Sequence, residues 1–364
     1  MTTPAFSPRL ERNPNARSDA ERESILVDPG FGNYFTDHMF LTEWTPEAGW
    51  HDPRVVPYGP LSLDPATAVL HYAQEIFEGL KAYAHADGSV WLFRPDANAV
   101  RLQRSAHRLA LPELPVEWFI GSVRALIEAD RDWVPTGEER SLYLRPFMFA
   151  SEVFLGVRPS QHVTYSVIAS PAGAYFAEGV KPVDIWLSET FSRAGSGGTG
   201  AAKCGGNYAA SLLPQQEAAA HGCAQVAFLD SVEHRWIEEL GGMNLYFVQS
   251  DGSIVTPELS GSILEGITRD SILQIARDLG HEVVERRVSI DEWRDGVADG
   301  SITEVFACGT AAVVTPVGKL KWDGGEVVSA EGESGKVTAD IRAALVDIQY
   351  GRAEDRHGWM TKVL

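Results

Sequence analysis

One lysine of the chain, Lys203, stands in a setting that suits covalent chemistry. It follows a run of glycine, serine, threonine and alanine, Gly195–Ala202, and a tyrosine, Tyr208, follows five positions later. Small residues let a backbone approach a bound molecule closely, and their apolar surroundings favour the neutral amine that a nucleophile requires. Only seven of the 31 basic residues are lysines, so other candidates are few. We expect Lys203 to form a Schiff base with a carbonyl cofactor.

The same run also satisfies a second template. Gly195, Gly197 and Gly200 match G-x-G-x-x-G, and Asp230 ends the next strand-like segment. In dinucleotide-binding proteins such glycines receive a pyrophosphate at the start of a helix. Here residues 190–194 separate the run from the preceding strand-like segment, and Asp230 lies later than the usual acidic residue. A nicotinamide-dependent oxidoreductase that uses this run is therefore the alternative from a different class.

Three short segments could bind an anionic group such as a phosphate. Arg101, Arg104 and Arg108 share one face of an expected helix, where one of them could clamp the anion. Gly266–Thr268 opens another expected helix, which presents free N–H groups and the positive end of its dipole. Gly309–Ala311 is a turn of small residues whose backbone could bind an anion. Because the net charge is −19, an anionic ligand needs a local positive set of this kind.

The elements that must position these residues alternate irregularly along the chain. Apolar spacing and turn residues predict helices over 66–79, 96–110 and 207–220. Asp87–Gly88 and Asp251–Gly252 lie between strand-like runs and predict two hairpins. Strands and helices in this irregular order indicate an α+β fold rather than a regular doubly wound sheet.

Length and composition indicate the domain organisation. A chain of 364 residues predicts two domains, and the divisions we expect are a flexible N-terminal arm (1–24), a smaller domain (25–172), a linker (173–181) and a larger domain that carries Lys203 (182–364). The strong negative charge argues against binding to nucleic acid or to an anionic membrane.

Other sequence features indicate the compartment. The three cysteines form no CxxC pair, which predicts neither disulfides nor a metal site. The polar N-terminus does not look like a secretory signal, and no run of eighteen apolar residues occurs, so we expect a cytoplasmic protein.

Eight motifs in this order resemble those of the branched-chain amino acid aminotransferases, which are class IV, fold-type IV pyridoxal-phosphate enzymes. The motifs are FGNYFTDHMF, HYAQEIFEGLKAY, FRPDANAVRLQRSAHRLALP, SLYLRP, GGTGAAKCGGNYAAS, IEELGGMNLYF, EGITRDSIL and GTAAVVTPVG. The resemblance covers about residues 31–350. It implies a two-domain fold like that of D-amino acid aminotransferase, with a smaller N-terminal α/β domain and a larger C-terminal pseudo-barrel domain.

The resemblance implies a role in cofactor binding for several residues. Lys203 would hold pyridoxal 5'-phosphate and move the substrate proton, Tyr208 would hydrogen-bond the ring 3'-oxygen, and Glu239 would pair with the ring nitrogen. The phosphate would be held by the side chain of Arg101 and by the backbone N–H groups of Ile267, Thr268 and Thr310. The anion-binding segments would thus serve one phosphate.

The resemblance also implies the substrate pocket and a homodimer. The side chains of leucine, isoleucine or valine would contact seven residues: Phe31, Tyr72, Phe77, Tyr143, Tyr175, Gly242 and Ala311. Arg145 would receive the side-chain carboxylate of glutamate or 2-oxoglutarate. Leu155 and Val157 lie in the loop that reaches the neighbouring subunit's site in this family. Position 242 is glycine where some relatives have threonine, which puts a hydroxyl contact there in doubt.

The activity expected from the resemblance is branched-chain amino acid transamination. The amino group would pass from L-leucine, L-isoleucine or L-valine to 2-oxoglutarate in two ping-pong half-reactions, giving a 2-oxo acid and L-glutamate. The alternatives within the same fold are a D-amino acid transaminase and an aminodeoxychorismate lyase. FTDHMF and the region from SLYLRP to LGV favour the branched-chain group.

Overall fold

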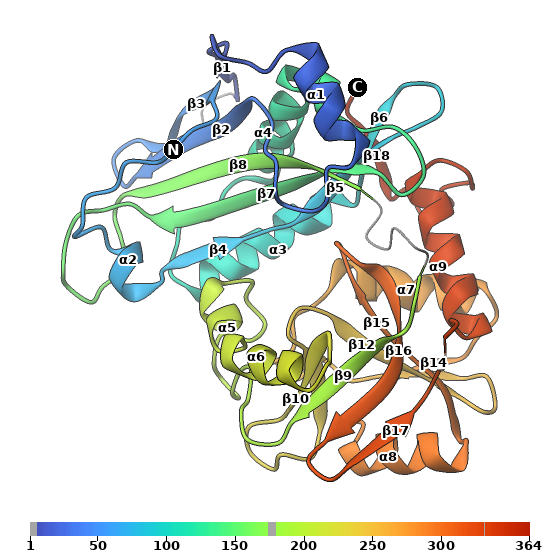
Figure 1. Cartoon of the computed structure of the whole chain (residues 1–364). Coiled ribbons are helices and arrows are strands. Elements are labelled where there is room, and N and C mark those ends of the chain that lie inside the picture. Colours follow the sequence, from blue (N-terminus) through green and yellow to red (C-terminus); the bar gives the residue numbers. More distant parts are fainter. Residues whose placement is uncertain (1–5, 174–179, 331) are drawn as a thin grey trace. The chain divides into compact units, whose positions relative to one another are not determined.

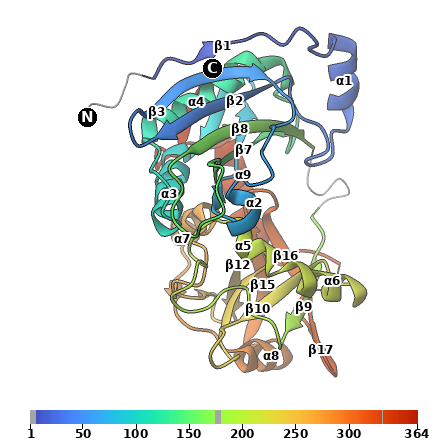
Figure 2. The same ribbon diagram turned by 90° about the vertical axis from the view of Figure 1, so that its left-hand side faces the viewer.

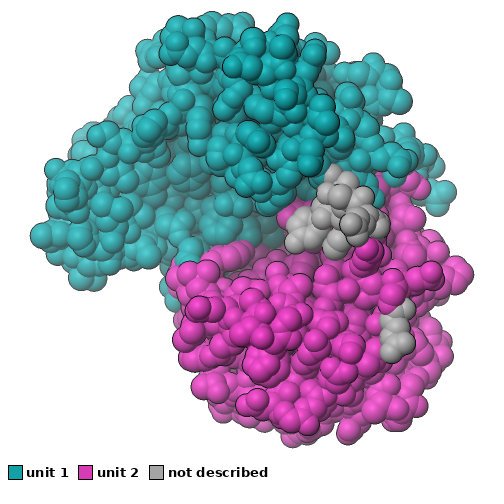
Figure 3. Space-filling view, in the orientation of Figure 1, with its two compact units in different colours: residues 1–175, 202–205, 348–364 teal, residues 176–201, 206–347 magenta. Residues whose placement is uncertain are grey.

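A computed structural model describes residues 6–173, 180–330 and 332–364, which form helices and two nine-stranded sheets (Figures 1 and 2). By its contacts the chain divides into two compact units, coloured separately in Figure 3. Unit 1 comprises residues 1–175, 202–205 and 348–364, and unit 2 comprises residues 176–201 and 206–347. Each unit is described below by itself.

The sheet of unit 1 has the strand order β1-β3-β2-β8-β7-β5-β6-β18, and β4 pairs with β7 outside this path. Its strands are β1 (Arg9–Leu10), β2 (His38–Thr45), β3 (Gly49–Pro57), β4 (Glu75–Phe77), β5 (Leu80–Ala84), β6 (Val90–Phe93), β7 (Ser141–Ala150), β8 (Val163–Ala172) and β18 (Met360–Lys362). Neighbouring strands are antiparallel except β1 and β3. The hairpin predicted at Asp87–Gly88 is confirmed, since it joins β5 to β6 and Gly88 has φ +79°.

Helices cover one face of this sheet and close its core. The helices of unit 1 are α1 (Asp19–Val27), α2 (Val69–Tyr72), α3 (Pro95–Arg108), α4 (Val116–Ala129) and the short 3-10 helix η1 (Arg131–Trp133). Figures 1 and 2 show α3 and α4 against the same side of the sheet. Trp118 and Phe119 of α4 are fully buried there with Phe40 of β2. Residues of α3 and β4 also belong to this core, which supports these two elements.

The segment around Lys203 belongs to this core. Ala202 is 3% exposed and Cys204 is 2% exposed, and both pack in the apolar core of unit 1. Residues 202–205 are therefore held with unit 1, whereas the expected division placed them with residues 182–364. The reason is long-range burial of the two neighbours of Lys203, which a division into continuous segments does not represent.

The sheet of unit 2 has the order β11-β10-β9-β16-β15-β12-β13-β14, with β17 paired to β16. Its strands are β9 (Val183–Ser188), β10 (Gln225–Leu229), β11 (Ile237–Leu240), β12 (Asn244–Gln249), β13 (Ile254–Thr256), β14 (Val283–Glu285), β15 (Ile302–Gly309), β16 (Val313–Trp322) and β17 (Gly325–Val328). The helices are α5 (Gly205–Ala209), α6 (Leu212–Ala220), α7 (Ile267–Asp278), α8 (Ile290–Asp299) and α9 (Lys336–Gln349). Helices α7 and α8 pack on β15, and α6 packs on β9 and β10. The hairpin predicted at Asp251–Gly252 joins β12 to β13 and is confirmed.

Two predicted helices are wrong in part. The helix predicted over 66–79 is limited to α2, because Ala73 takes a left-handed conformation with φ 49° and the chain continues as β4. Ile76 is fully buried in that strand and pairs with Met148 of β7. The helix predicted over 207–220 is divided into α5 and α6. The first difference arises where tertiary packing overrides local propensity, and the second agrees with the expectation that Pro214, which has no backbone N–H, would kink the helix or mark a first turn, since it lies in the first turn of α6.

The N-terminal arm and the linker were further expectations. The segment expected to be a flexible arm contains β1 and the start of α1, whose Ser18 caps the helix with Glu21. Its flexibility stays a prediction. Most of the expected linker, residues 174–179, lies outside the described residues.

The turn between β10 and β11 is organised by one carboxylate. Asp230 accepts hydrogen bonds from four backbone N–H groups, those of Val232 (3.0 Å), Glu233 (2.7 Å), Arg235 (3.0 Å) and Trp236 (2.9 Å). Burial would raise the pKa of Asp230, but these hydrogen bonds together lower it to about 2. The ionised carboxylate therefore stabilises this turn.

We expect Asp230→Asn to lower the free energy of unfolding by about 1 kcal/mol at pH 7, since the charge-assisted bonds are lost at a site with solvent access. The depressed pKa means that the stabilisation is complete above an unfolded-state pKa of about 3.9 and disappears as the pH falls toward 2. Thermal melts between pH 7 and pH 3 should thus show the difference from the unmodified protein shrinking below pH 4. Glu47→Gln, at an exposed carboxyl, is the control, and a difference that does not change with pH would contradict this role of Asp230.

Candidate active site

In unit 1, the backbone of Lys203 is held on both sides. Its N–H donates to the hydroxyl of Ser105 on α3 (2.9 Å), and its carbonyl accepts the N–H of Phe77 at the end of β4 (2.9 Å). The Lys203 amine lies 4.7 Å from the centre of the Phe77 ring. The amine thus has a defined position on an aromatic surface.

Arg145 of β7 shares this aromatic surface. Its guanidinium carbon lies 4.8 Å from the centre of the Phe77 ring, and its Nη2 donates to the hydroxyl of Tyr143 (2.9 Å). The ring of Phe31 contacts that of Tyr143 edge-on, with the centroids 5.0 Å apart. The structure therefore brings together Lys203 and four of the predicted substrate residues.

The Arg145 guanidinium has an unused donor. Within the described part of the chain, its buried Nε has no hydrogen-bond partner. A buried donor without a partner is costly, and a planar guanidinium suits a carboxylate. Arg145 is therefore suited to bind an acidic group beside Lys203.

Other predicted substrate residues lie elsewhere or outside the described residues. The Tyr72 hydroxyl donates to the carbonyl of Leu155 (2.6 Å), which connects α2 with the loop between β7 and β8. Leu155 is 67% exposed and Val157 is 89% exposed. Tyr175 lies outside the described residues.

Arg101 is the buried member of the basic face predicted on α3, and its partner is Glu78. Its Nε donates to Glu78 Oε1 (2.7 Å) and its Nη2 to Oε2 (2.8 Å), while Asn98 donates to Oε2 (2.7 Å). Burial alone would raise the pKa of Glu78, but the charge and hydrogen bonds of Arg101, reinforced by Lys203, hold that pKa below its ordinary value. Sequence reasoning missed Glu78, although it directly follows Phe77 in a matched motif.

The other two arginines of that face are different. Arg104 and Arg108 are exposed, so the shared face predicted from sequence places only Arg101 in the interior. The helical periodicity was sufficient to align the three side chains, but not to select the buried one.

A second carboxylate fixes the segment after the lysine. Glu75 accepts a hydrogen bond from the N–H of Gly205, and a side-chain carbon at Gly205 would collide with that carboxylate. Burial raises the pKa of Glu75, against the opposing effects of the Gly205 N–H and of Arg145. Glycine at this position permits the close approach.

In unit 2, Glu239 of β11 is a buried and well-oriented carboxylate. Its Oε1 accepts from Arg193 Nη1 (2.8 Å) and from the backbone N–H of Leu264 (2.8 Å), and its Oε2 is 3.4 Å from Asn244 Nδ2. The side chains of Arg193 and Glu239 are each 2% exposed. Sequence reasoning missed Arg193 and Asn244, although Asn244 lies in the matched motif IEELGGMNLYF.

The start of α7 lies close to the side chain of Asn244. Gly266 is its N-cap, and within the described residues no side chain caps this end. A side-chain carbon at Gly266 would collide with the amide oxygen of Asn244. The N–H groups of Ile267 and Thr268 lie in this first turn, where the helix dipole favours an anion.

Three further predicted residues lie in turns or in a short helix of unit 2. Thr310 and Ala311 form the turn between β15 and β16, and Tyr208 lies on α5. A side-chain carbon at Gly242 would lie 3.9 Å from Cε1 of Tyr208, which is ordinary contact. Glycine leaves space at that position.

The glycine run does not form a dinucleotide-binding turn. It lies between β9 and α5, and residues 189–204, all of which the structure describes, contain no helix. A side-chain carbon at Gly200 would lie 2.6 Å from the carbonyl carbon of Ser262, so this glycine is required for backbone packing. The structure therefore contradicts the nicotinamide-dependent alternative.

A known protein family matches most of this chain. The family described as amino-transferase class IV matches residues 75–320. The chain therefore belongs to the class IV aminotransferases.

Across the described ranges, no group of three or more His, Cys, Asp or Glu side chains could hold a metal ion. No described helix has the length and apolar character needed to cross a membrane.

Individual similar proteins carry names that are more specific than that of the family. The chain is 61% identical over 363 residues to a probable branched-chain-amino-acid aminotransferase of Streptomyces coelicolor, with 99% of each chain covered. It is 59% identical to a branched-chain-amino-acid aminotransferase of Mycolicibacterium smegmatis, with 97% of each chain covered. These comparisons confirm the resemblance predicted from the motifs.

Solved structures confirm the fold. The branched-chain amino acid aminotransferase of Escherichia coli superimposes with a TM-score of 0.75 at 32% identity, covering 90% of this chain and 99% of the other. The T.th. branched-chain amino acid aminotransferase with pyridoxamine 5'-phosphate has a TM-score of 0.74 at 31% identity, covering 89% and 98%. The α+β, fold-type IV architecture expected from the sequence is confirmed.

Proposed function

We propose that this chain is a branched-chain amino acid transaminase, which transfers the amino group between L-leucine, L-isoleucine or L-valine and 2-oxoglutarate. The observation that carries this proposal is the cluster in unit 1, where the Lys203 amine and the Arg145 guanidinium lie on the same Phe77 ring. An amine nucleophile, an apolar wall and one partly buried cation suit substrates that are alternately apolar and acidic. The relatives at 59–61% identity carry the corresponding name.

The proposed cofactor is pyridoxal 5'-phosphate, and the residues present fit it. Lys203 supplies an amine for its carbonyl, the uncapped first turn of α7 suits its phosphate, and buried Glu239 suits its protonated ring nitrogen. A second structure of the T.th. enzyme contains N-(5'-phosphopyridoxyl)-L-glutamate. When bound, the cofactor supplies an electron sink for the negative charge that forms at the substrate α-carbon.

The remaining cofactor residues are assigned by the same proposal. Besides Lys203 and Glu239, the residues assigned to the cofactor are Arg101, Tyr208, Ile267, Thr268 and Thr310. Glu78 orients Arg101 through Nε and Nη2, and we assign the Arg101 guanidinium to the phosphate.

The chain's own groups then carry the proton and the charge. Lys203 Nζ removes the proton from the substrate α-carbon and returns it in the reverse half-reaction. Arg193 and Leu264 hold Oε1 of Glu239, and we assign Oε2 to the ring nitrogen. The ion pair with Arg193 keeps Glu239 charged in a buried position.

The substrate side chain is assigned to the aromatic residues of unit 1. Phe31, Phe77 and Tyr143 supply apolar surface for leucine, isoleucine and valine, together with Tyr72, Tyr175, Gly242 and Ala311 as further proposed contacts. Arg145, whose Nε is unused within the described residues, receives the side-chain carboxylate of glutamate or 2-oxoglutarate.

An amino-donor panel with 2-oxoglutarate tests the proposal. We expect turnover with L-leucine, L-isoleucine and L-valine, and turnover at least about a hundredfold lower with D-enantiomers. Preference for D-amino acids would support the D-amino acid transaminase instead. Pyruvate release from aminodeoxychorismate, without transamination of leucine, would support the lyase.

Arg145→Met should separate the two substrates. We expect KM for 2-oxoglutarate and glutamate to rise by about tenfold or more, because a charge-assisted pair with the carboxylate is lost, while KM for leucine changes less than about threefold. Single-turnover measurements follow each half-reaction separately. Arg104→Met, at an exposed arginine of α3, is the control, and an equal loss for leucine and glutamate would reject this role of Arg145.

We also propose a homodimer and a cytoplasmic location. The loop between β7 and β8 exposes Val153, Leu155 and Val157, and α2 exposes Leu70 beside it. Contiguous apolar side chains on a surface are typical of an interface, and in this family the loop reaches the neighbouring subunit's site. We expect the Leu155→Asp/Val157→Asp variant to shift the mass measured by light scattering from dimer toward monomer and to lower leucine turnover. A dimer of unchanged affinity would remove this loop from the interface.

A further inference from the structure

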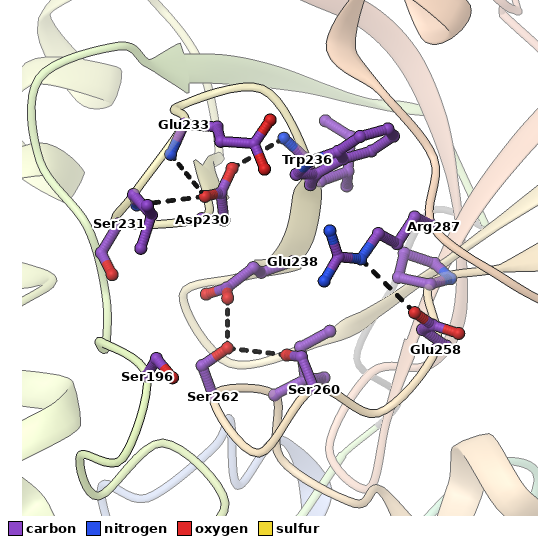
Figure 4. A pocket seen from close by; sticks show the side chains of 14 residues that line it. Ser196, Asp230, Ser231, Glu233, Trp236, Glu238, Glu258, Ser260, Ser262 and Arg287 are labelled. Atoms are coloured by element: carbon purple, nitrogen blue, oxygen red, sulfur yellow. Dashed lines mark hydrogen bonds and ion pairs between the residues drawn. The ribbon is translucent and has the colours of Figure 1, made fainter.

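Unit 2 contains a pocket of about 260 Å³ that includes none of the residues assigned to the cofactor or to the substrate. Its walls come from the β10–β11 turn, from β11, from the loop after β13, from the glycine run and from Arg287. Figure 4 shows these side chains arranged in a ring, with the Glu238 carboxylate within it and the Arg287 guanidinium directed toward the same space.

Glu238 is the incompletely satisfied group of this pocket. The residue is only 6% exposed, and its Oε1 accepts a hydrogen bond from the hydroxyl of Ser262, which in turn contacts the hydroxyl of Ser260. Within the described residues, its buried Oε2 has no hydrogen-bond partner. A buried carboxylate oxygen without a donor is unfavourable, and burial accordingly raises the pKa of Glu238.

The charge around this carboxylate selects the kind of ligand. Asp230 is satisfied by four backbone N–H groups, but Glu233 and Glu258 add negative charge, and Arg287 is the one basic residue of the lining. Arg287 is already paired with Glu258 at 3.4 Å. The lining therefore has an excess of negative charge, although Arg193 behind it lowers the pKa of Glu238, and Oε2 of Glu238 has no donor within the described residues, which favours a cation that carries N–H groups.

We propose that this pocket is a second binding site, which holds a small ammonium group through an N–H donated to Glu238. The terminal torsion of a glutamate side chain is soft, so the carboxylate can turn one oxygen toward the ligand and keep its bond to Ser262. Free amines and amino acids share this ammonium chemistry. An amino acid would also place its carboxylate toward Arg287, whereas a simple amine would not.

Calorimetric titration of the holoenzyme tests this site with ligands that cannot form a Schiff base. Trimethylammonium has one N–H, and tetramethylammonium has the same charge and none, so we expect the first to bind at least tenfold more tightly. N,N-dimethylglycine adds a carboxylate and identifies the amino acid type of ligand. Tighter binding of dimethylglycine, reduced by Arg287→Gln, would assign the site to amino acids, and equal binding would assign it to amines.

Variants locate the binding in this pocket. Glu238→Gln should weaken trimethylammonium binding at least tenfold, whereas Glu233→Gln, which removes a rim charge without the buried oxygen, should weaken it less than threefold. Equal affinity in Glu238→Gln and the unmodified protein would overturn the proposal. The comparison of the two ligands on the unmodified protein does not depend on the folding of any variant, and equal affinities or an absence of saturable binding there would also overturn it.

Discussion

Lys203→Ala is expected to reduce the transamination of leucine by more than about a thousandfold and to remove the visible absorption of lysine-bound cofactor. In the proposed mechanism no neighbouring group replaces both functions of the amine, which would hold the cofactor covalently and move the substrate proton. The backbone contacts with Ser105 and Phe77 do not involve the side chain, so the segment should keep its position. Stopped-flow absorbance and steady-state turnover measure the two losses.

Two variants complete this test of the nucleophile. Lys203→Arg keeps a cation over the Phe77 ring but lacks the nucleophilic amine, and it should be as inactive as Lys203→Ala. Lys319→Ala removes a surface lysine that pairs with Glu326, and its turnover should stay within about twofold of the unmodified protein. Leucine turnover at the unmodified rate in Lys203→Ala would reject the proposed chemistry.

Glu239→Gln is expected to lower kcat by about a hundredfold, while the affinity for the cofactor falls by less than about tenfold. The amide has the shape of the carboxylate and can still accept from Arg193 and Leu264, but it does not carry the charge that keeps a ring nitrogen protonated. The effect should therefore appear in catalysis more than in binding. Equilibrium dialysis of the cofactor and single-turnover rates separate the two.

The loss of this charge also affects stability, which supplies an independent measurement. Arg193 would lose its ion pair with Glu239 in a buried position, although its carbonyl hydrogen bonds and its charge interaction with Glu238 remain, and such a loss costs about 3 kcal/mol. We expect the apoprotein of Glu239→Gln to melt at a lower temperature than the unmodified apoprotein. Glu117→Gln, on the exposed face of α4, should change neither property. Unchanged turnover in Glu239→Gln would remove this carboxylate from the proposed mechanism.

Local features were the most predictable part of the fold. The two hairpins could be located because Asp-Gly favours the backbone conformation that a tight turn requires, and both glycines have positive φ. The helix predicted over 66–79 was wrong because β4 is stabilised by pairing with β7, far away in sequence. Residues 202–205 likewise pack with unit 1 through burial that no local pattern records.

The sequence by itself determined the family, because ordered motifs preserve the types and spacing that the chemistry needs, and it supplied the nucleophile and most of the other site residues that we propose. Only the tertiary structure decided which arginine of α3 is buried and that Glu78, 23 residues away, neutralises it. It likewise decided that Arg193 holds Glu239 and that Gly200 packs against the backbone of Ser262. The physical reason is that charge pairing and close backbone approach depend on distances between remote segments, which spacing along the chain does not encode.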